Sequence, residues 1–189
     1  TIAGNRLRGN FYFDQATRAD NTKVTRIAAT NVTFSGLGNA IKNASGALII
    51  KPEGIAGILT GEVDLAAGGV SLGGAMGLRI NKTNAAVDET ITVNGSTIVV
   101  RFSAAEANVF GFFATDLSLN IANFITIEGN VSFTAGTVPG LGAVSMFAGD
   151  GIDIFMGLGP IKNADGTRNP DAIGVLLTSR GEVGIATSM

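Results

Sequence analysis

Residues 9–66 of this 189-residue chain reappear, altered but in the same order, at residues 129–186. Self-similarity over a long period indicates a repeat architecture, and it constrains the fold more strongly than any local motif does. Three of the four matched blocks lie 120 residues apart and one lies 121 apart. The blocks are Gly9–Phe13 with Gly129–Phe133, Gly36–Gly38 with Gly157–Gly159, Ile41–Gly46 with Ile161–Gly166, and Gly61–Ala66 with Gly181–Ala186.

The block Ile-Lys-Asn-Ala-x-Gly is too specific to arise from shared composition alone. We therefore expect residues 1–120 to form a first β-repeat and residues 121–189 to form a partial second copy of it. Because the second copy stops part-way, the simplest expectation is a longer parent chain with further copies.

Strict alternation of apolar and polar residues recurs along the chain, as in Ile98/Val100/Phe102 and Leu117/Leu119/Ile121. A period of two is typical of strands with one buried face. Asn94-Gly95 lies between two such segments and predicts a type I′ hairpin turn, which needs positive φ angles. Ser103 followed by Glu106 fits a capping box and predicts a short helix or turn there.

Strand beginnings fall seven or eight residues apart in places, for example at Val63, Val70 and Leu78, and again at Phe110, Leu117 and Ile125. Short strands at that spacing are typical of a solenoid, in which each coil stacks on the next. The predicted fold is therefore all-β, an elongated, Gly-rich, solenoid-like stack of short strands with a hairpin. An antiparallel β-sandwich is the alternative, because a tightly turned meander has a similar spacing.

Composition narrows the function classes. The formal net charge is −2, so the chain has no basic field for nucleic acid or for an anionic membrane surface. The long uncharged run from Asn130 to Gly149 is interrupted by glycines and Pro139, which disfavours membrane insertion. Cysteine and histidine are absent, which removes thiolate catalysis and the usual general base at neutral pH. The sequence from Thr1 onward has none of the features of a signal peptide. We expect that any such segment was removed before Thr1.

Gly69-Val70-Ser71-Leu72-Gly73 matches the Gly-x-Ser-x-Gly nucleophile motif. That motif needs a helix after the serine and a histidine to take its proton, and neither is expected here. Ser71 is therefore interpreted as a strand residue that faces solvent. No opposed pair of carboxylates and no phosphate loop stands out, so the prediction is that the chain is not an enzyme.

Oxygen-bearing side chains gather between Asn163 and Asp171. Calcium takes six to eight oxygen ligands, and such turns can supply them. Asn163, Asp165 and Asp171 are the candidate calcium ligands, and the neighbouring Asp150 and Asp153 are weaker candidates. The alternative is a surface turn, which is favoured because the first copy has Ser45 where the second has Asp165. Calcium is the one cofactor considered; no other is expected.

The Gly-Asn-Phe, Gly-Leu-Gly, Ile-Lys-Asn-Ala-x-Gly and Gly-Glu-Val blocks together resemble the tandem segments of giant bacterial and archaeal cell-surface proteins, which include adhesins, fibre-forming proteins and biofilm-matrix proteins. The resemblance implies an extracellular or cell-surface location and a structural, scaffold or filament role. The implied partners are copies of the chain itself or adjacent repeats. The alternative is an adhesion module that recognises a glycan or a surface, with calcium.

Overall fold

The computed structural model describes residues 5–35, 40–138, 142–163, 165–179 and 181–188. The Gly36–Gly38 block of the repeat lies outside these residues. Twelve strands and one 3₁₀ turn are found in the described part, and the prediction of an all-β chain is confirmed. The elements are β1 (Leu7–Thr17), β2 (Lys23–Phe34), β3 (Ile41–Lys51), β4 (Gly54–Ala67), β5 (Val70–Asn81), β6 (Val87–Val93), β7 (Ser96–Phe102), η1 (Ala104–Glu106), β8 (Val109–Ile121), β9 (Ile125–Val138), β10 (Gly142–Leu158), β11 (Ile173–Thr178) and β12 (Val183–Ser188).

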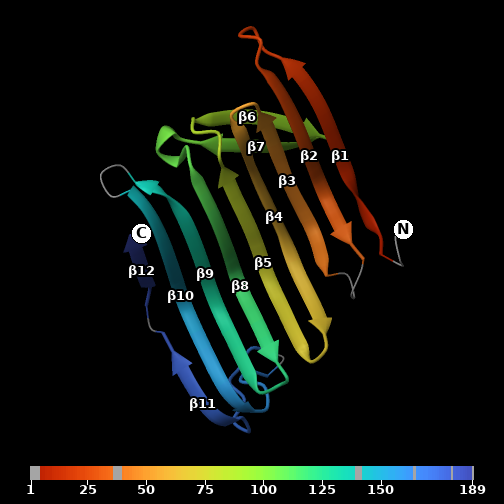
Figure 1. Ribbon diagram of the computed structural model, residues 1–189. Helices are drawn as coiled ribbons and strands as arrows, with labels where there is room; N and C mark the ends of the chain where they lie inside the picture. Colours follow the sequence, from red (N-terminus) through yellow and green to blue (C-terminus); the bar gives the residue numbers. More distant parts are fainter. Residues whose placement is uncertain (1–4, 36–39, 139–141, 164, 180, 189) are drawn as a thin grey trace.

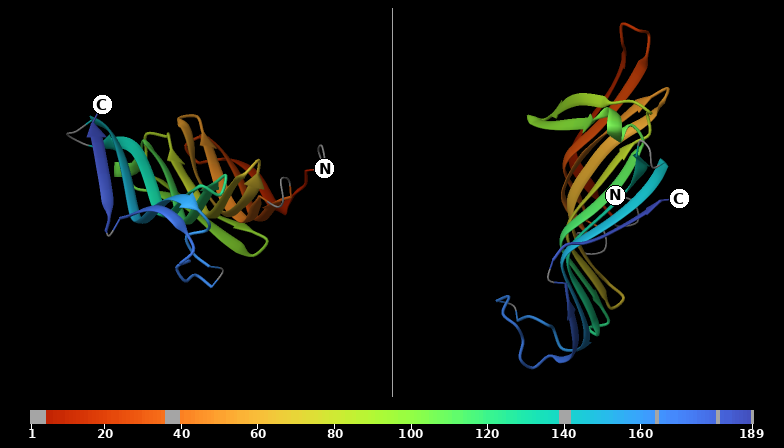
Figure 2. Two further views of the ribbon diagram at one scale, coloured as in Figure 1. Left: turned by 90° about the horizontal axis from the view of Figure 1, so that it is seen from below. Right: turned by 90° about the vertical axis from the view of Figure 1, so that its left-hand side faces the viewer.

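Ten of these strands form one antiparallel sheet (Figure 1). Its order is β1-β2-β3-β4-β5-β8-β9-β10-β11, and β12 pairs with a second stretch of β10. Apart from the β6–β7 hairpin, which is inserted between β5 and β8, and β12, which returns to β10, each strand lies antiparallel beside the one before it, so the sheet is a meander. The predicted solenoid-like stack is not present in the described residues, and no second full sheet covers the first to make a sandwich (Figure 2).

The spacing of seven or eight residues was misleading because the strands are long and bulged. The segments that begin at Phe110 and Leu117 are two halves of the single strand β8, separated by a change of register between Ala114 and Leu117. An extra residue at such a bulge resets the alternation of side chains, so one strand has the pattern of two.

The hairpin predicted at Asn94-Gly95 is confirmed. β6 and β7 pair with each other from Val87↔Phe102 to Val93↔Ser96. Asn94 and Gly95 have φ angles of 47° and 81°, as a type I′ turn requires. The hairpin lies across one end of β1–β4 on one face of the sheet (Figures 1 and 2).

The buried core lies between this hairpin and the sheet. The hairpin contributes the inward side chains of both its strands, and the sheet contributes small or β-branched residues that let the hairpin approach closely. The cluster consists of Val24, Ala28, Ala47, Ile49, Ala56, Val87, Ile91, Val93, Ile98, Val100, Phe102 and Val109. Alternation in β6 and β7 therefore reflects a face packed on the sheet and a face in water.

Two polar side chains, Asn81 and Glu106, hold the chain segments that enter and leave the hairpin. Asn81 is fully buried; its amide Nδ2 donates to the backbone oxygens of Ala85 (2.9 Å) and Glu106 (3.0 Å). Its Oδ1 accepts from the backbone N–H (3.1 Å) and the hydroxyl (2.8 Å) of Thr83. All four hydrogen-bonding positions of this amide are used, so its burial carries no unsatisfied group.

Glu106 ends the η1 turn that follows β7. The Ser103 backbone N–H donates to its carboxylate at 2.9 Å and the Ser103 hydroxyl at 3.0 Å, and Arg79 pairs with it at 2.7 Å. The Arg79 guanidinium also lies over the Phe102 ring, 5.1 Å from its centroid. The capping residues expected from Ser103 and Glu106 thus form a single turn linked to the sheet.

We expect Glu106→Gln to lower the free energy of unfolding at pH 7, because it removes the charge that Arg79 and the Ser103 donors bind. The loss should be about 1 kcal/mol, since the carboxylate is partly exposed and water screens the ion pair. The Ser103 N–H and then Arg79 lower the pKa of Glu106 in the folded chain. Its contribution is therefore complete above the unfolded-state pKa, about 4.3, and is lost as the pH falls through the lower folded-state pKa. Denaturant titrations from pH 7 to pH 3 should show a shallower acid dependence in the variant. An unchanged dependence would contradict this role.

Four bulges share one construction. In each, a residue with φ between 51° and 58° and the apolar residue after it lie opposite a single glycine on the neighbouring strand. The bulged pairs are Asn31-Val32 opposite Gly9, Asn43-Ala44 opposite Gly61, Asp116-Leu117 opposite Gly74, and Gly151-Ile152 opposite Gly129. A Cβ on any of these glycines would lie within 3.0 Å of the bulge, so the glycine makes room for it.

Strand pairs β1–β2 and β9–β10 have the same register at an offset of 120. Leu7↔Phe34 corresponds to Ile127↔Ile154, and Phe13↔Ile27 corresponds to Phe133↔Phe147. The bulge opposite Gly9 also recurs opposite Gly129. The sheet continues without a break across the 120/121 boundary, which falls at the end of β8.

The two copies differ after β10. In the first copy, Ile41 begins β3, which pairs with β2 as far as Ile50. In the second, the described residues 161–163 and 165–168 belong to a loop, with a bridge between Lys162 and Arg168. The edge of β10 is consequently paired in two pieces, with β12 at Val144–Gly149 and with β11 at Asp153–Leu158.

Candidate functional site

The predicted calcium ligands lie in the loop between β10 and β11. The Asp165 Oδ1 accepts from the Thr167 backbone N–H at 2.9 Å and from its hydroxyl at 2.6 Å. These bonds lower the pKa of Asp165, the hydroxyl most strongly. The Asn163 amide donates to the same hydroxyl at 3.1 Å. Asn163 and Asp165 are therefore brought together as a hydrogen-bonded turn.

Asp171 belongs to a separate turn, in which its backbone N–H donates to Asn169 Oδ1 at 3.0 Å. Of the weaker candidates, Asp150 accepts from the Asn130 amide at 3.5 Å, and Asp153 lies opposite Glu128 across the β9–β10 pair. Among the described residues, no group of three or more Asp, Glu, His or Cys side chains is arranged to hold a metal ion. Calcium binding stays a prediction, and calorimetric titration would test it.

Ser71 lies in β5, is exposed, and pairs with Ala66 and Asn120 on the two neighbouring strands. β5 continues as strand to Asn81, so the turn into a helix that a nucleophilic serine requires is absent at this position.

The most unusual feature is the sheet face opposite the hairpin, which we call the open face. A row of paired residues crosses nine strands there with an apolar side chain or a glycine at every position. The row is Phe11–Ala29–Gly46–Leu59–Leu78–Phe112–Phe133–Phe147–Ile185. Nearer the other end a second row runs Leu65–Leu72–Leu119–Ile127–Ile154–Leu177.

The side chains of the open face are exposed. Phe13 has 71% of its surface in contact with solvent, Phe11 61% and Leu59 53%. In the described part of the chain, all the exposed large apolar residues except Val99, Phe124 and Met146 belong to this face. Outside the bulges, strand alternation places one charged residue on it, Lys23 at the start of β2.

The other face, beyond the hairpin, is polar. Lys42 pairs with Asp64 at 2.7 Å there, and Lys162 pairs with Glu128 at 2.5 Å. Strands β3 to β10 thus have an apolar side and a charged, hydrated side. Sequence reasoning predicted alternation but did not identify the apolar side as uncovered, since alternation is the same whether the apolar side is covered or bare.

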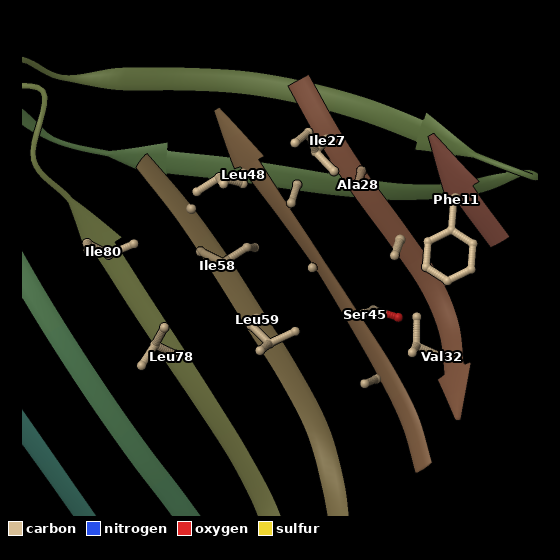
Figure 3. A pocket seen from close by; sticks show the side chains of 15 residues that line it. Phe11, Ile27, Ala28, Val32, Ser45, Leu48, Ile58, Leu59, Leu78 and Ile80 are labelled. Atoms are coloured by element: carbon tan, nitrogen blue, oxygen red, sulfur yellow. The ribbon is translucent and has the colours of Figure 1, made fainter. Parts of the chain in front are cut away.

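The open face contains a groove of about 340 Å³ at the β1–β5 end. Phe11, Ile27 and Val32 form one wall, and Leu59, Leu78 and Ile80 form the other (Figure 3). Gly46 and Gly57 lie along its floor, where the missing side chains create the depression. Ser45 is the one lining residue with a polar side chain among the described residues, and it pairs with Thr60, so its hydroxyl is directed to the hydrated face and the groove suits an apolar group.

No family model, curated protein or solved structure matches this chain. Within the described residues, no helix is both long enough and apolar enough to cross a bilayer.

Proposed function

We propose that the chain is a structural tandem-repeat module of an extracellular surface or fibre-forming protein, in which successive copies of the 120-residue unit add their strands to one sheet. The role is mechanical: the module extends a scaffold, and its hydrated face is presented to the surroundings. The extracellular location rests on the resemblance of the repeat blocks to surface proteins.

The observation that supports the proposal is the junction between β8 and β9. β9 is the counterpart of β1, and β8 is the last sheet strand of the first unit. The two pair from Val109↔Gly136 to Ile121↔Ile125. At an offset of 120 this register places a β8-like strand beside β1, with the Phe112 position opposite Phe13. β1 is an edge of the sheet, and edge strands offer unpaired backbone groups to another strand.

A lengthened chain tests the proposal. Insertion of a second copy of residues 9–128 between residues 128 and 129 adds six sheet strands, the equivalents of β1–β5 and β8. At about 4.8 Å per strand, a continuous sheet should grow by about 29 Å along one axis. Small-angle scattering measures this as an increase in the maximum dimension of one rigid body. A chain lengthened by 120 Gly and Ser residues is the control.

Two separately tumbling bodies in the lengthened chain would contradict the proposal, since each unit would then close on itself. Adhesion is the alternative function, and a glycan array with and without calcium distinguishes it. Specific glycan binding that calcium removal abolishes would replace the scaffold proposal with that one.

A further inference from the structure

From the open face we infer an interface with a second copy of this chain: two sheets pack face to face through it and form a two-layer sandwich. This goes beyond the proposed function, because it concerns the flat side of the sheet and not the edge along which repeats are added.

The first argument is area. The exposed surface of the chain is 11198 Å². Folded monomers of 19.2 kDa expose about 8,400 Å² by the usual scaling of surface with mass, which leaves an excess of about 2,800 Å². Homodimers that exist only as dimers bury about 2,000–5,000 Å² or more, counted over both partners. Two copies that each buried this excess would together bury about 5,600 Å², which matches the upper end of that range.

The second argument is the chemistry of the face. Sheets that stack in sandwiches lie about 10 Å apart with interdigitated apolar side chains. The open face combines projecting residues such as Phe112 and Phe133 with depressions at Gly46, Gly57 and Gly61. Projections and depressions on one surface suit an isologous contact, in which the same patch meets itself about a two-fold axis. With Lys23 as the one charge that alternation places there, two such faces meet without like-charge repulsion in their middle.

A lipid surface is the competing occupant, and the charges argue against it. Proteins that lie on anionic membranes surround their apolar surface with lysine and arginine. This chain has 13 basic and 15 acidic residues, and its sheet strands have acidic groups such as Glu62, Asp64 and Glu128 on the side away from the open face. No basic rim surrounds the open face in the described strands, so a second copy fits it better.

The test compares two neighbouring positions of β4. Leu59 lies at the centre of the open face, whereas Thr60 is exposed on the hydrated face. We expect sedimentation equilibrium to give twice 19.2 kDa for the unaltered chain. Leu59→Glu should weaken the dimer about a hundredfold or more, because the two-fold axis buries two uncompensated carboxylates. Thr60→Glu should leave the dimer unchanged, and circular dichroism should show strand content in both variants.

Three results would overturn the inference. One is a monomer at all concentrations. Another is a dimer that survives Leu59→Glu, which would indicate association through the β1 edge. The third is a monomer that binds phosphatidylcholine vesicles through Leu59, which would make the open face a lipid-binding surface. A second charged variant, Phe13→Asp in β1, guards against misfolding at one position. Failure here leaves the scattering result for the lengthened chain unaffected, so the two proposals can fail separately.

Discussion

Replacing Phe102 by alanine should lower the free energy of unfolding by about 3–5 kcal/mol, the largest effect expected of a single side chain in this molecule. Phe102 is 1% exposed and closes β7 against the sheet, with the Arg79 guanidinium over its ring. In the described residues the hairpin is the one layer that packs on the buried face of the sheet. The cavity left by Phe102→Ala therefore cannot be filled by side chains from another layer. Denaturant unfolding followed by circular dichroism measures the change.

The matched control for Phe102 is Val99→Ala. Val99 lies in the same strand, points away from the sheet and is 41% exposed, so its loss should change the free energy by no more than about 0.5 kcal/mol. Equal effects at the two positions would mean that the hairpin does not pack on the sheet through this face.

Gly74→Ala should destabilise the chain by about 2–4 kcal/mol, because two costs combine there. Gly74 has a φ of 133°, and a Cβ on it would lie 2.9 Å from the backbone oxygens of both Thr115 and Asp116. The neighbouring Gly73 has its nearest atom at 3.9 Å and no positive φ. Gly73→Ala should therefore be neutral or slightly stabilising, since it restricts the unfolded chain.

The two glycine variants are compared by their denaturation midpoints. The bulge at Asp116-Leu117 lies opposite residue 74, and a side chain there should loosen the pairing of β5 with β8. Gly74→Ala should therefore also increase amide exchange in the middle of β8. If the variants at 73 and 74 unfold at the same denaturant concentration, the glycine is not needed to accommodate the bulge.

Local patterns predicted local structure well. Asn94-Gly95 identified a hairpin turn, and Ser103 with Glu106 identified the turn after it, because each depends on a few adjacent residues. The recurrence of Gly9 at Gly129 was visible in the sequence too, but the structural reason for a glycine at these positions was not. Each glycine lies opposite a bulge contributed by another strand, and that contact exists only after the register is set.

Strand count and layering could not be predicted in the same way. The break at Asp116 made β8 resemble two short strands, which favoured a solenoid. For the calcium loop, spacing predicted that Asn163, Asp165 and Asp171 converge. The structure gives Asp165 and Asp171 to different turns, each closed by its own hydrogen bonds to Thr167 and Asn169. Spacing alone shows neither the donors of Thr167 that occupy the Asp165 carboxylate nor the separate turn in which the Asp171 backbone N–H donates to Asn169.

β1 and β12 lie on opposite margins of the sheet, so in the proposed scaffold tension would reach the sheet through these two strands. Antiparallel hydrogen bonds run perpendicular to the strands, so a pull that enters through β1 and leaves through β12 acts along those bonds. The bonds then open one after another from the margins, instead of resisting together in shear. If the chain has the proposed scaffold role, we expect it to lengthen in small steps at low force and not to behave as a stiff support.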